Sequence, residues 1–442
     1  MIGGGLGDFA PGEWTDDTSM ALCIAEVTAG GAVDIDAIGD RFLDWFRSGP
    51  ADVGVQTRAV LSGASSGSQL AGRAADYHGA HPDSSAGNGS LMRTAPIALA
   101  HLGDDDAIAA AAREVSALTH ADPLCQDACV LWCIAIDRAV REERLDGVRD
   151  GLALLPDDRR GSLEQRLDAA EAEPPSTFVP NGFVVTALQA AYASIVQTPE
   201  PTDAPPCLHL QHALEAAVRI GHDTDTVAAI AGAMLGARWG MSAIPAEWRR
   251  ILHGWPGVTG KGLEKLGYLA ARNGAAGKYG WPLVEHIDYL PLQYGKNALA
   301  AHPFDDGVWL AGATVLDELP EGTDAVVSLC LTGRRQVPDH VEHINYRLMD
   351  EPDPEHNPNL DFILVDAAQT VARLRDEGKT VVLHCVAAHS RTPAVGIAYA
   401  MLRGVPLAEA LPAVCSALPA AHPNSGFRRA LSRLEPHLIG LD

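Results

Sequence analysis

The sequence is poor in aromatic and basic residues. Phe, Trp and Tyr make up only 5% of the 442 residues, although hydrophobic residues reach 47%. The formal net charge is −24, because 33 Lys and Arg residues face 57 Asp and Glu residues. Binding to nucleic acid or to an anionic membrane surface depends on clustered Lys and Arg. The composition therefore argues against nucleic acid and membranes as partners and leaves enough apolar residues for sizeable cores.

The sequence also lacks the marks of a secreted or membrane-spanning chain. It begins without the basic and apolar segments of a signal peptide, and no apolar run is long enough to cross a bilayer. None of its eight cysteines forms a Cys-x-x-Cys pair, so we expect a reducing, cytoplasmic location. Cys125, Cys129 and Cys133 recur every four residues without neighbouring His ligands, which predicts buried packing residues on one helix face.

Two kinds of pattern divide the chain. Helical spacing of Ala, Leu and Ile dominates up to about residue 272, whereas 63–89 and 171–180 are rich in Gly, Pro, Ser and Asp and predict loops. Beyond 273–277, short β-type runs alternate with helical ones, which predicts an α/β layer with a largely parallel sheet. We therefore expect a multidomain protein with an all-α domain at 1–275 and an α/β domain at 276–442. The predicted helices are 20–28, 107–117, 123–141, 184–196, 208–219, 226–239, 360–377 and 393–402, and the predicted strands are 308–310, 325–329, 343–348 and 380–384.

Two acidic tetrads open predicted helices in the first half. They are Thr15-Asp16-Asp17-Thr18 and Asp223-Thr224-Asp225-Thr226, each followed by an apolar run. One interpretation is ordinary helix capping, because Asp and Thr are favoured at helix starts. The other is a cation site, because two carboxylates at a buried helix start repel one another. Ligands that offer only oxygen would favour Mg²⁺ or Mn²⁺ over zinc.

The tetrads belong to three blocks that occur in a recognisable order. The blocks are 13–18, 87–93 and 221–226, and Leu118-Thr119-His120 lies between the second and third. In this order they resemble the signature blocks of the ADP-ribosylglycohydrolases of the dinitrogenase-reductase-activating type. The resemblance implies an all-α bundle with two divalent cations, Mg²⁺ or Mn²⁺. It also implies hydrolysis of the N- or O-glycosidic bond between ADP-ribose and a modified protein or another ADP-ribose conjugate.

The same resemblance assigns residues to roles. It implies metal ligands at Thr15, Asp16, Asp17, Asp223, Asp225 and Thr226, and an ADP-ribose-binding loop at Gly87, Asn88, Gly89 and Ser90. His120 either faces the ligand or is a structural histidine. Members of the family begin with a further helix that carries a Gly-Asp-Ala-Leu-Gly type motif, and this sequence starts just after that point. We therefore expect the N-terminal helix to be missing from the domain at 1–275.

A cysteine motif stands between a predicted strand and a predicted helix in the second half. Cys385 and Arg391 are separated by five residues, the spacing of a loop that wraps a phosphate at a helix start. The helix dipole and the arginine would favour a thiolate at Cys385, and Arg391 could bind two phosphate oxygens. The alternative is a buried cysteine at the end of a strand.

With the closing segment 422–428, this motif resembles the dual-specificity protein phosphatases over about residues 300–438. The resemblance implies a nucleophile at Cys385 and a phosphate-binding Arg391, with Ser390 or Thr392 assisting departure of the thiolate. It implies substrate contacts at His384, Ala387, Ala388 and His389. Asp350 is the candidate general acid and Asp353 the second choice, with a solvated turn as the alternative. Ala388 stands where the family usually has Gly, and a positive φ there would be unfavourable by on the order of 1 kcal/mol.

Three hypotheses for function follow. The first is a bifunctional hydrolase that removes ADP-ribose with one half and phosphate, from a protein or a small molecule, with the other. The second is a module that binds ADP-ribose or phosphate without chemistry. The third is an active phosphatase joined to a degenerate glycohydrolase half.

Overall fold

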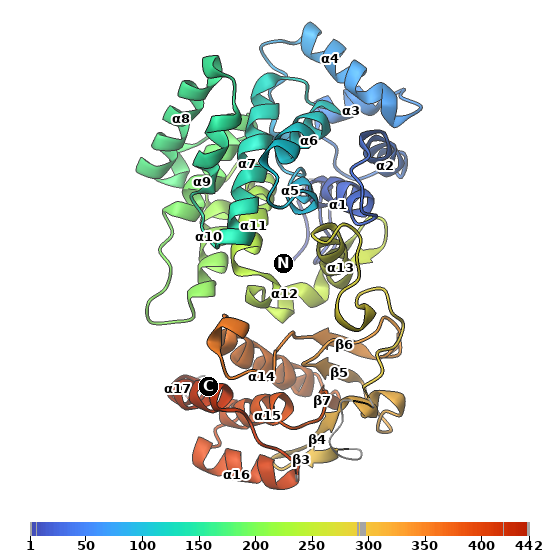
Figure 1. Cartoon of the computed structure of the whole chain (residues 1–442), viewed down its shortest axis with the longest axis vertical. Coiled ribbons are helices and arrows are strands. Elements are labelled where there is room, and N and C mark those ends of the chain that lie inside the picture. Colours follow the sequence, from blue (N-terminus) through green and yellow to red (C-terminus); the bar gives the residue numbers. More distant parts are fainter. Residues whose placement is uncertain (1, 6, 290, 292–297, 419, 440–442) are drawn as a thin grey trace. The chain divides into compact units, whose positions relative to one another are not determined.

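The computed structural model describes residues 2–5, 7–289, 291, 298–418 and 420–439 (Figure 1). These residues form two compact units. The first unit comprises Met1–Ile244 and Trp248–Ala275, and the second comprises Pro245–Glu247 and Ala276–Asp442. In the described part of the chain, no helix is both long enough and apolar enough to cross a membrane.

The first unit is helical apart from one short antiparallel pair of strands, β1 (His253–Gly254) and β2 (Val258–Thr259). This confirms the all-α architecture expected for the first half. Its helices are α1 (Asp16–Thr28), α2 (Ile35–Arg47), α3 (Val55–Leu61), α4 (Leu70–Ala80), α5 (Pro96–Ala100), α6 (Asp105–Ala117), α7 (Pro123–Glu142), α8 (Asp157–Ala172), α9 (Val184–Val196), α10 (His209–Arg219), α11 (Thr224–Trp239) and α13 (Gly260–Ala270). The short helix α12 (Ala246–Ile251) begins within the three residues that belong to the second unit.

Helix α7 is buried along most of its length and carries the row of three cysteines. Cys125, Cys129 and Cys133 are all buried, which confirms that they are packing residues. The Cys125 thiol lies 3.3 Å from the carbonyl oxygen of Gly87, and the Cys133 thiol lies 3.5 Å from that of Thr94. Helix α7 therefore packs directly against the 87–94 segment.

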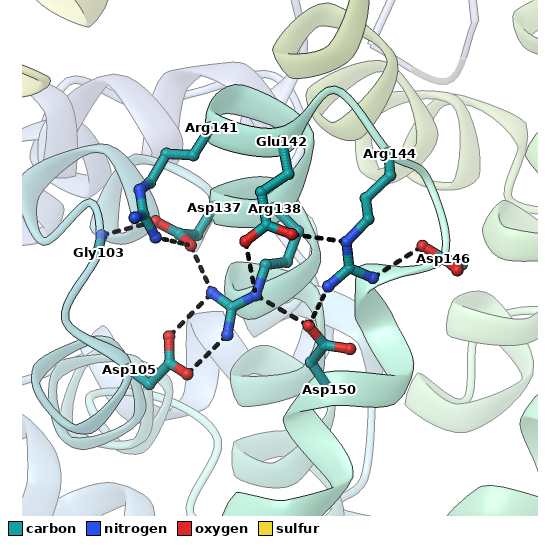
Figure 2. A network of polar contacts seen from close by, with 9 residues as sticks. All are labelled: Gly103, Asp105, Asp137, Arg138, Arg141, Glu142, Arg144, Asp146 and Asp150. Atoms are coloured by element: carbon teal, nitrogen blue, oxygen red, sulfur yellow. Dashed lines mark hydrogen bonds and ion pairs between the residues drawn. The ribbon is translucent and has the colours of Figure 1, made fainter.

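The end of α7 is held by a network of charged groups (Figure 2). Asp137 is fully buried, and Arg138 donates to it over 2.5 Å. Arg138 also donates to both oxygens of Asp105 in α6 and to Asp150 in the following 3₁₀ segment, over 2.6 to 2.9 Å. One arginine thus ties three consecutive elements together.

The strongest periodic patterns of the first half all became helices, namely α1, α6, α7, α9, α10 and α11. The prediction of a loop throughout 63–89 was wrong, because α4 lies within it. Only Leu70 and Ala74 of α4 are buried, so this helix has no apolar stripe that a periodicity argument could detect.

The second unit is built on one five-stranded mixed sheet in the order β3-β4-β7-β5-β6. Strands β4, β7, β5 and β6 are parallel, and β3 pairs antiparallel with β4 at one edge. This confirms the α/β class and the largely parallel sheet. The strands are β3 (Leu299–His302), β4 (Asp305–Gly312), β5 (Ala325–Ser328), β6 (Glu342–Asn345) and β7 (Val381–Cys385), and the helices are α14 (Leu360–Asp376), α15 (Arg391–Leu402), α16 (Leu407–Ala417) and α17 (Ser425–Leu438).

Both faces of this sheet are covered. The larger core joins alternate strand residues, such as Leu310, Val327 and Leu383, to the four helices. The smaller core, with Val326 and Val382, packs against the 3₁₀ segment Ala313–Asp317 and the loop before β6. Because β7 is central and buried on both faces, its C-terminal residue Cys385 is held at a fixed point of the sheet.

Candidate active sites

A cavity of about 1100 Å³ in the first unit brings the three sequence blocks together. Its wall includes Thr15 and Asp16 at the start of α1, the loop 87–89, and residues 222–226 at the start of α11. His120 also lines it, as does the half-exposed Asp52. Segments more than 200 residues apart in sequence thus meet around one space.

The two acidic helix starts do not act as ordinary caps. Neither the Thr15 nor the Asp223 side chain makes a capping hydrogen bond. Thr15 instead donates its hydroxyl proton to one oxygen of Asp17 over 2.6 Å. The other oxygen of Asp17 is buried and has no hydrogen-bond partner, although the side chain is only 2% exposed. A buried carboxylate oxygen without a donor is what a missing positive charge would leave.

The electrostatics of the acidic cluster agree with this. Burial, and then the nearby charges of Asp52 and Asp225, raise the pKa of Asp16 to about 7. Burial also raises the pKa values of Asp17 and Asp223. A cation among these carboxylates would remove the repulsion, so the residues fit the hard cation that the sequence resemblance implies. No ready-made group of three or more His, Cys, Asp or Glu ligands is found among the residues that the structure describes.

The loop 87–90 is fastened to the second acidic block through amides. The Asn88 side chain donates to Asp223 over 2.7 Å and to the carbonyl oxygen of Asn181 over 3.0 Å. The Asn181 side chain in turn accepts from the backbone N–H of Asp223 over 2.9 Å. Asn181 was not identified from the sequence. It is a single asparagine just after the predicted loop 171–180, and no motif surrounds it.

His120 faces the same loop and is held by Thr119. Arg93 donates to the Thr119 hydroxyl over 2.6 Å, and that hydroxyl is hydrogen-bonded to Nδ1 of His120 over 2.7 Å. Burial, followed by the charge of Arg93, lowers the pKa of His120 to about 3, so the ring is neutral. A Cβ on Gly89 would lie 3.2 Å from Nε2 and 2.9 Å from Cε1, so only glycine leaves room there.

Ser90 and Asp52 lie in places that the sequence motifs did not indicate. Ser90 is fully buried and does not line the cavity, and its hydroxyl receives a hydrogen bond from Ser116 over 2.9 Å. Asp52 was missed by sequence reasoning, because it stands alone before α3 and outside every motif. The charge of Asp52 nevertheless acts on the pKa values of both Asp16 and Asp223, which places it beside the acidic cluster.

The second candidate site lies at the end of β7 in the α/β unit. Cys385 is 1% exposed and pairs with Gly312 of β4, and α15 begins at Arg391 after the loop 386–390. Ala388 in this loop has a φ of 53°, the conformation for which glycine is suited. The sequence raised a positive φ at this position only as a condition under which alanine would be unfavourable, and the loop adopts that conformation with the alanine in place. Ala387 is half-buried, and His389 is exposed at the rim.

Arg391 is positioned to meet an anion. Its Nη1 donates to the carbonyl oxygens of Leu329 and Leu348, over 3.3 and 3.0 Å. Its Nε is buried and has no hydrogen-bond acceptor. Although burial acts to lower the pKa of Arg391, the charge of Cys385 and of other neighbours holds it above the usual value. A phosphate next to Cys385 would supply the acceptor that Nε lacks.

The two candidate acids differ in their surroundings. One oxygen of Asp350 lies 4.0 Å from Nε of Arg391, and the other accepts from the side chain of Asn424 over 3.0 Å. Asp353 instead caps a 3₁₀ turn by accepting from the N–H of Glu355. The geometry therefore brings Asp350 to the phosphate loop and gives Asp353 a local structural contact.

His384 lies beneath the loop and joins a chain of hydrogen bonds. Its Nδ1 donates to the Cys385 carbonyl oxygen over 3.3 Å, and its Nε2 lies 2.6 Å from the Ser328 hydroxyl. Ser328 is also 2.8 Å from Nε2 of His343. Burial lowers the pKa of His384 to about 4, so the ring is neutral and Nε2 accepts from Ser328. Ser390 is buried and accepts from the backbone N–H of Asn424.

Comparisons with known proteins support the resemblance stated for each half of the chain. The family model described as ADP-ribosylglycohydrolase matches residues 1–278. The ADP-ribosylarginine hydrolase Tri1 of Pseudomonas putida is 31% identical over an alignment of 261 residues, and the match covers 56% of this chain and 64% of that protein. This chain thus spans less than two thirds of that relative. The solved structure titled "ADP-ribosylglycohydrolase-related protein complex" is 28% identical with a TM-score of 0.46, and covers 62% of this chain and 87% of its own. The second half resembles dual specificity protein phosphatase 1 of Arabidopsis thaliana, which is 33% identical over 99 residues, 22% of this chain and 50% of that protein.

Proposed function

Because the chain belongs to the ADP-ribosylglycohydrolase family through residues 1–278, we propose that its helical unit removes ADP-ribose from a modified protein or another ADP-ribose conjugate. The observation that carries the proposal is the cavity that joins the three blocks, with an unpartnered Asp17 oxygen beside it. A module that only bound ADP-ribose would not need several buried carboxylates that repel one another.

We assign a role to each group of residues from where it lies around the cavity. Thr15, Asp16, Asp17, Asp223, Asp225 and Thr226 would hold divalent cations, for which we propose Mg²⁺. When bound, such a cation supplies a polarised water and a counter-charge for sugar hydroxyls. Gly87, Asn88 and Gly89 present the loop surface, and Nε2 of His120 is the ring nitrogen available to hydrogen-bond the ADP-ribose. We assign Asp52 as the acceptor of the proton from the attacking water, because it faces the cavity from outside the two acidic blocks.

The experiment that tests this function follows release of free ADP-ribose from peptides carrying ADP-ribosylated arginine or serine. We expect release with Mg²⁺ and loss of release with EDTA. Asp223→Ala should abolish it, because both the cation site and the Asn88 contact are lost. Ser48→Ala, at the end of α2, is a matched control outside the cavity. Release that continues in EDTA and in Asp223→Ala would refute the proposal.

For the α/β unit, we propose cysteine-dependent hydrolysis of a phosphate monoester. The Cys385 thiolate attacks phosphorus, and a sulfur–phosphorus bond forms as the bond to the leaving oxygen breaks. Asp350 donates its proton to that oxygen, and Arg391 binds two of the remaining phosphate oxygens through Nε and Nη2. Water then attacks phosphorus, Asp350 takes its proton, and the thiolate leaves with help from Ser390. The observation that carries this proposal is the buried, acceptor-free Nε of Arg391 beside Cys385.

Hydrolysis of p-nitrophenyl phosphate tests this second activity. Cys385→Ser should remove turnover, while Asp350→Asn should lower kcat by about 10²- to 10⁴-fold, the usual contribution of a general acid. Asp353→Asn is the matched control, because Asp353 caps a turn. Equal losses from the two aspartate variants would contradict the assignment of Asp350.

The thiols agree with a reducing location for both activities. Cys23, Cys125, Cys129, Cys133, Cys207, Cys330, Cys385 and Cys415 are all free. A thiolate nucleophile works only while it stays reduced, which supports our proposal of a cytoplasmic location.

A further inference from the structure

Exposed apolar side chains gather at the mouth of the cavity in the helical unit. In the part of this unit that the structure describes, the large hydrophobic residues that are exposed are Ile2, Val55, Val179, Phe183, Val196 and Val218. Ile2, Val55 and Val218 line the cavity itself. Phe183 directly follows Gly182, which also lines the cavity. We call Ile2, Val55, Phe183 and Val218 the apolar rim.

Four separate segments of the chain supply the apolar rim. Ile2 lies at the start of the described chain, Val55 is the first residue of α3, and Val218 lies in the last turn of α10. Phe183 precedes α9 and pairs across an antiparallel bridge with Gly87 of the loop 87–90. Isolated apolar residues on a protein surface are ordinary. Four that converge on one opening from different segments indicate a contact surface.

The apolar rim lies next to the groups that would cut the bond. Val55 follows the proposed proton acceptor Asp52 by three residues, and Val218 precedes Asp223 by five. All four residues line the same cavity. Because the glycosidic bond must lie at the acidic cluster to be hydrolysed, the group that carries the ADP-ribose leaves the cavity past these two valines. Val55 is 83% exposed and Val218 51%, so both have free surface for that group to contact.

The charges around the cavity distinguish between kinds of carrier. No Lys or Arg is found among the described residues that line it, whereas the lining carboxylates are Glu13, Asp16, Asp52, Asp223 and Asp225. A nucleic acid would bring further phosphates to this acidic surface, where no basic side chain neutralises them. A small conjugate would fit inside a cavity of about 1100 Å³ and would not need apolar side chains at its mouth. A polypeptide can offer apolar side chains without adding negative charge.

We propose that the apolar rim binds the polypeptide that carries the ADP-ribose, at apolar residues beside the modified one. The proposal rests on the glycohydrolase function proposed above and adds its substrate class, which is an ADP-ribosylated protein with an apolar sequence around the modified residue. The sugars and the diphosphate enter the cavity, and neighbouring side chains of the substrate cover Val55 and Val218. Burial of apolar surface then favours this substrate over the same linkage in a polar sequence.

Calorimetry on the full chain in EDTA, where release is expected to stop, tests the proposal without turnover. It would compare two peptides with the same ADP-ribosylated arginine or serine, one with leucine and the other with serine on both sides of it. We expect the leucine peptide to bind about tenfold or more tightly than the serine peptide, the scale of one buried aliphatic side chain. An oligonucleotide with ADP-ribose on its terminal phosphate should bind less tightly than either peptide. If it binds more tightly than the leucine peptide, nucleic acid is the carrier and the proposal is wrong.

Variants of the apolar rim test whether these side chains cause the preference. Val55→Ser and Val218→Ser together should bring the affinity ratio of the two peptides to near one and leave the binding of free ADP-ribose unchanged. Val196→Ser is the matched control, because Val196 is an exposed valine at the end of α9 that does not line the cavity.

Three outcomes would overturn the proposal. They are a ratio near one in the unmodified chain, a ratio that survives the double variant, and an equal loss of affinity for free ADP-ribose and for the leucine peptide in that variant. The last of these would assign the apolar rim to ADP-ribose itself. Release of ADP-ribose with Mg²⁺ reports separately on the glycohydrolase function, so its absence is distinguishable from a failure of the apolar rim.

Discussion

A single alanine in the phosphate loop is expected to lower the stability of the α/β unit. Ala388 adopts a φ of 53°, where a Cβ is unfavourable by about 1 kcal/mol. We predict that Ala388→Gly raises the unfolding free energy of this unit by up to that amount, offset in part by the greater freedom of glycine in the unfolded chain. Thermal unfolding measures the change. Ala387→Gly is the control and should be destabilising, because Ala387 has no positive φ. A more stable Ala387→Gly with an unchanged Ala388→Gly would contradict the account.

The buried His384 predicts a specific dependence on pH. Burial lowers its pKa to about 4, whereas in the unfolded chain it is near 6.5. Between these values the unfolded chain binds more protons, so stability falls as the pH falls from 6.5 toward 4. The full loss is on the order of 3 kcal/mol for this histidine.

Hydrogen exchange of β7 amides, followed from pH 7 to pH 4.5, would measure this loss locally. His384→Asn keeps a donor for the Cys385 carbonyl oxygen and cannot gain a charge, so it should flatten the slope relative to the unmodified chain. Equal slopes in the two proteins would show that His384 does not carry the dependence.

At the scale of elements, the network at the end of α7 predicts one large and one small effect. Arg138 is the main partner of the fully buried Asp137, whereas Arg141 lies 3.4 Å away and is about half exposed (Figure 2). Arg138→Met leaves a buried carboxylate with weaker compensation and should lower the unfolding free energy by about 3 kcal/mol or more. Arg141→Met should lower it by less than about 1 kcal/mol. Chemical denaturation of both variants would measure the difference, and similar values for the two would refute it.

Elements whose signals are local could be predicted from the sequence, and those that depend on distant partners could not. The Asp-rich starts of α1 and α11 and the strand before Cys385 carry their chemistry within a few residues. Helix α4 was not predicted because it buries only two side chains. Asn181 and Asp52 were not predicted because their roles depend on Asp223 and Asp16, which the fold brings near them. Contacts of this kind have no spacing rule in one sequence.

The same limit applies to the molecule as a whole, where the sequence suggested two consecutive domains. Pro245–Glu247 belong to the second unit although the first unit continues to Ala275. Ala246 is 1% exposed within the core of the second unit, and its backbone N–H donates to both oxygens of Asp366, at 3.0 and 3.3 Å. A fragment that starts at Ala276 would lack this residue and leave the buried Asp366 with fewer donors.

We therefore predict that residues 276–442 alone are less stable than the same unit in the full chain, by about 1–3 kcal/mol for the lost donor. Hydrogen exchange of α14 amides in both proteins would measure the difference. Within the intact chain, Ala246→Pro removes the N–H at a first helical position that tolerates proline and adds two ring carbons, whereas Ala246→Gly removes only the methyl group. Proline should reproduce most of the fragment's loss and glycine less of it. Equal protection of α14 in the fragment and the full chain would mean that the second unit is complete without Pro245–Glu247.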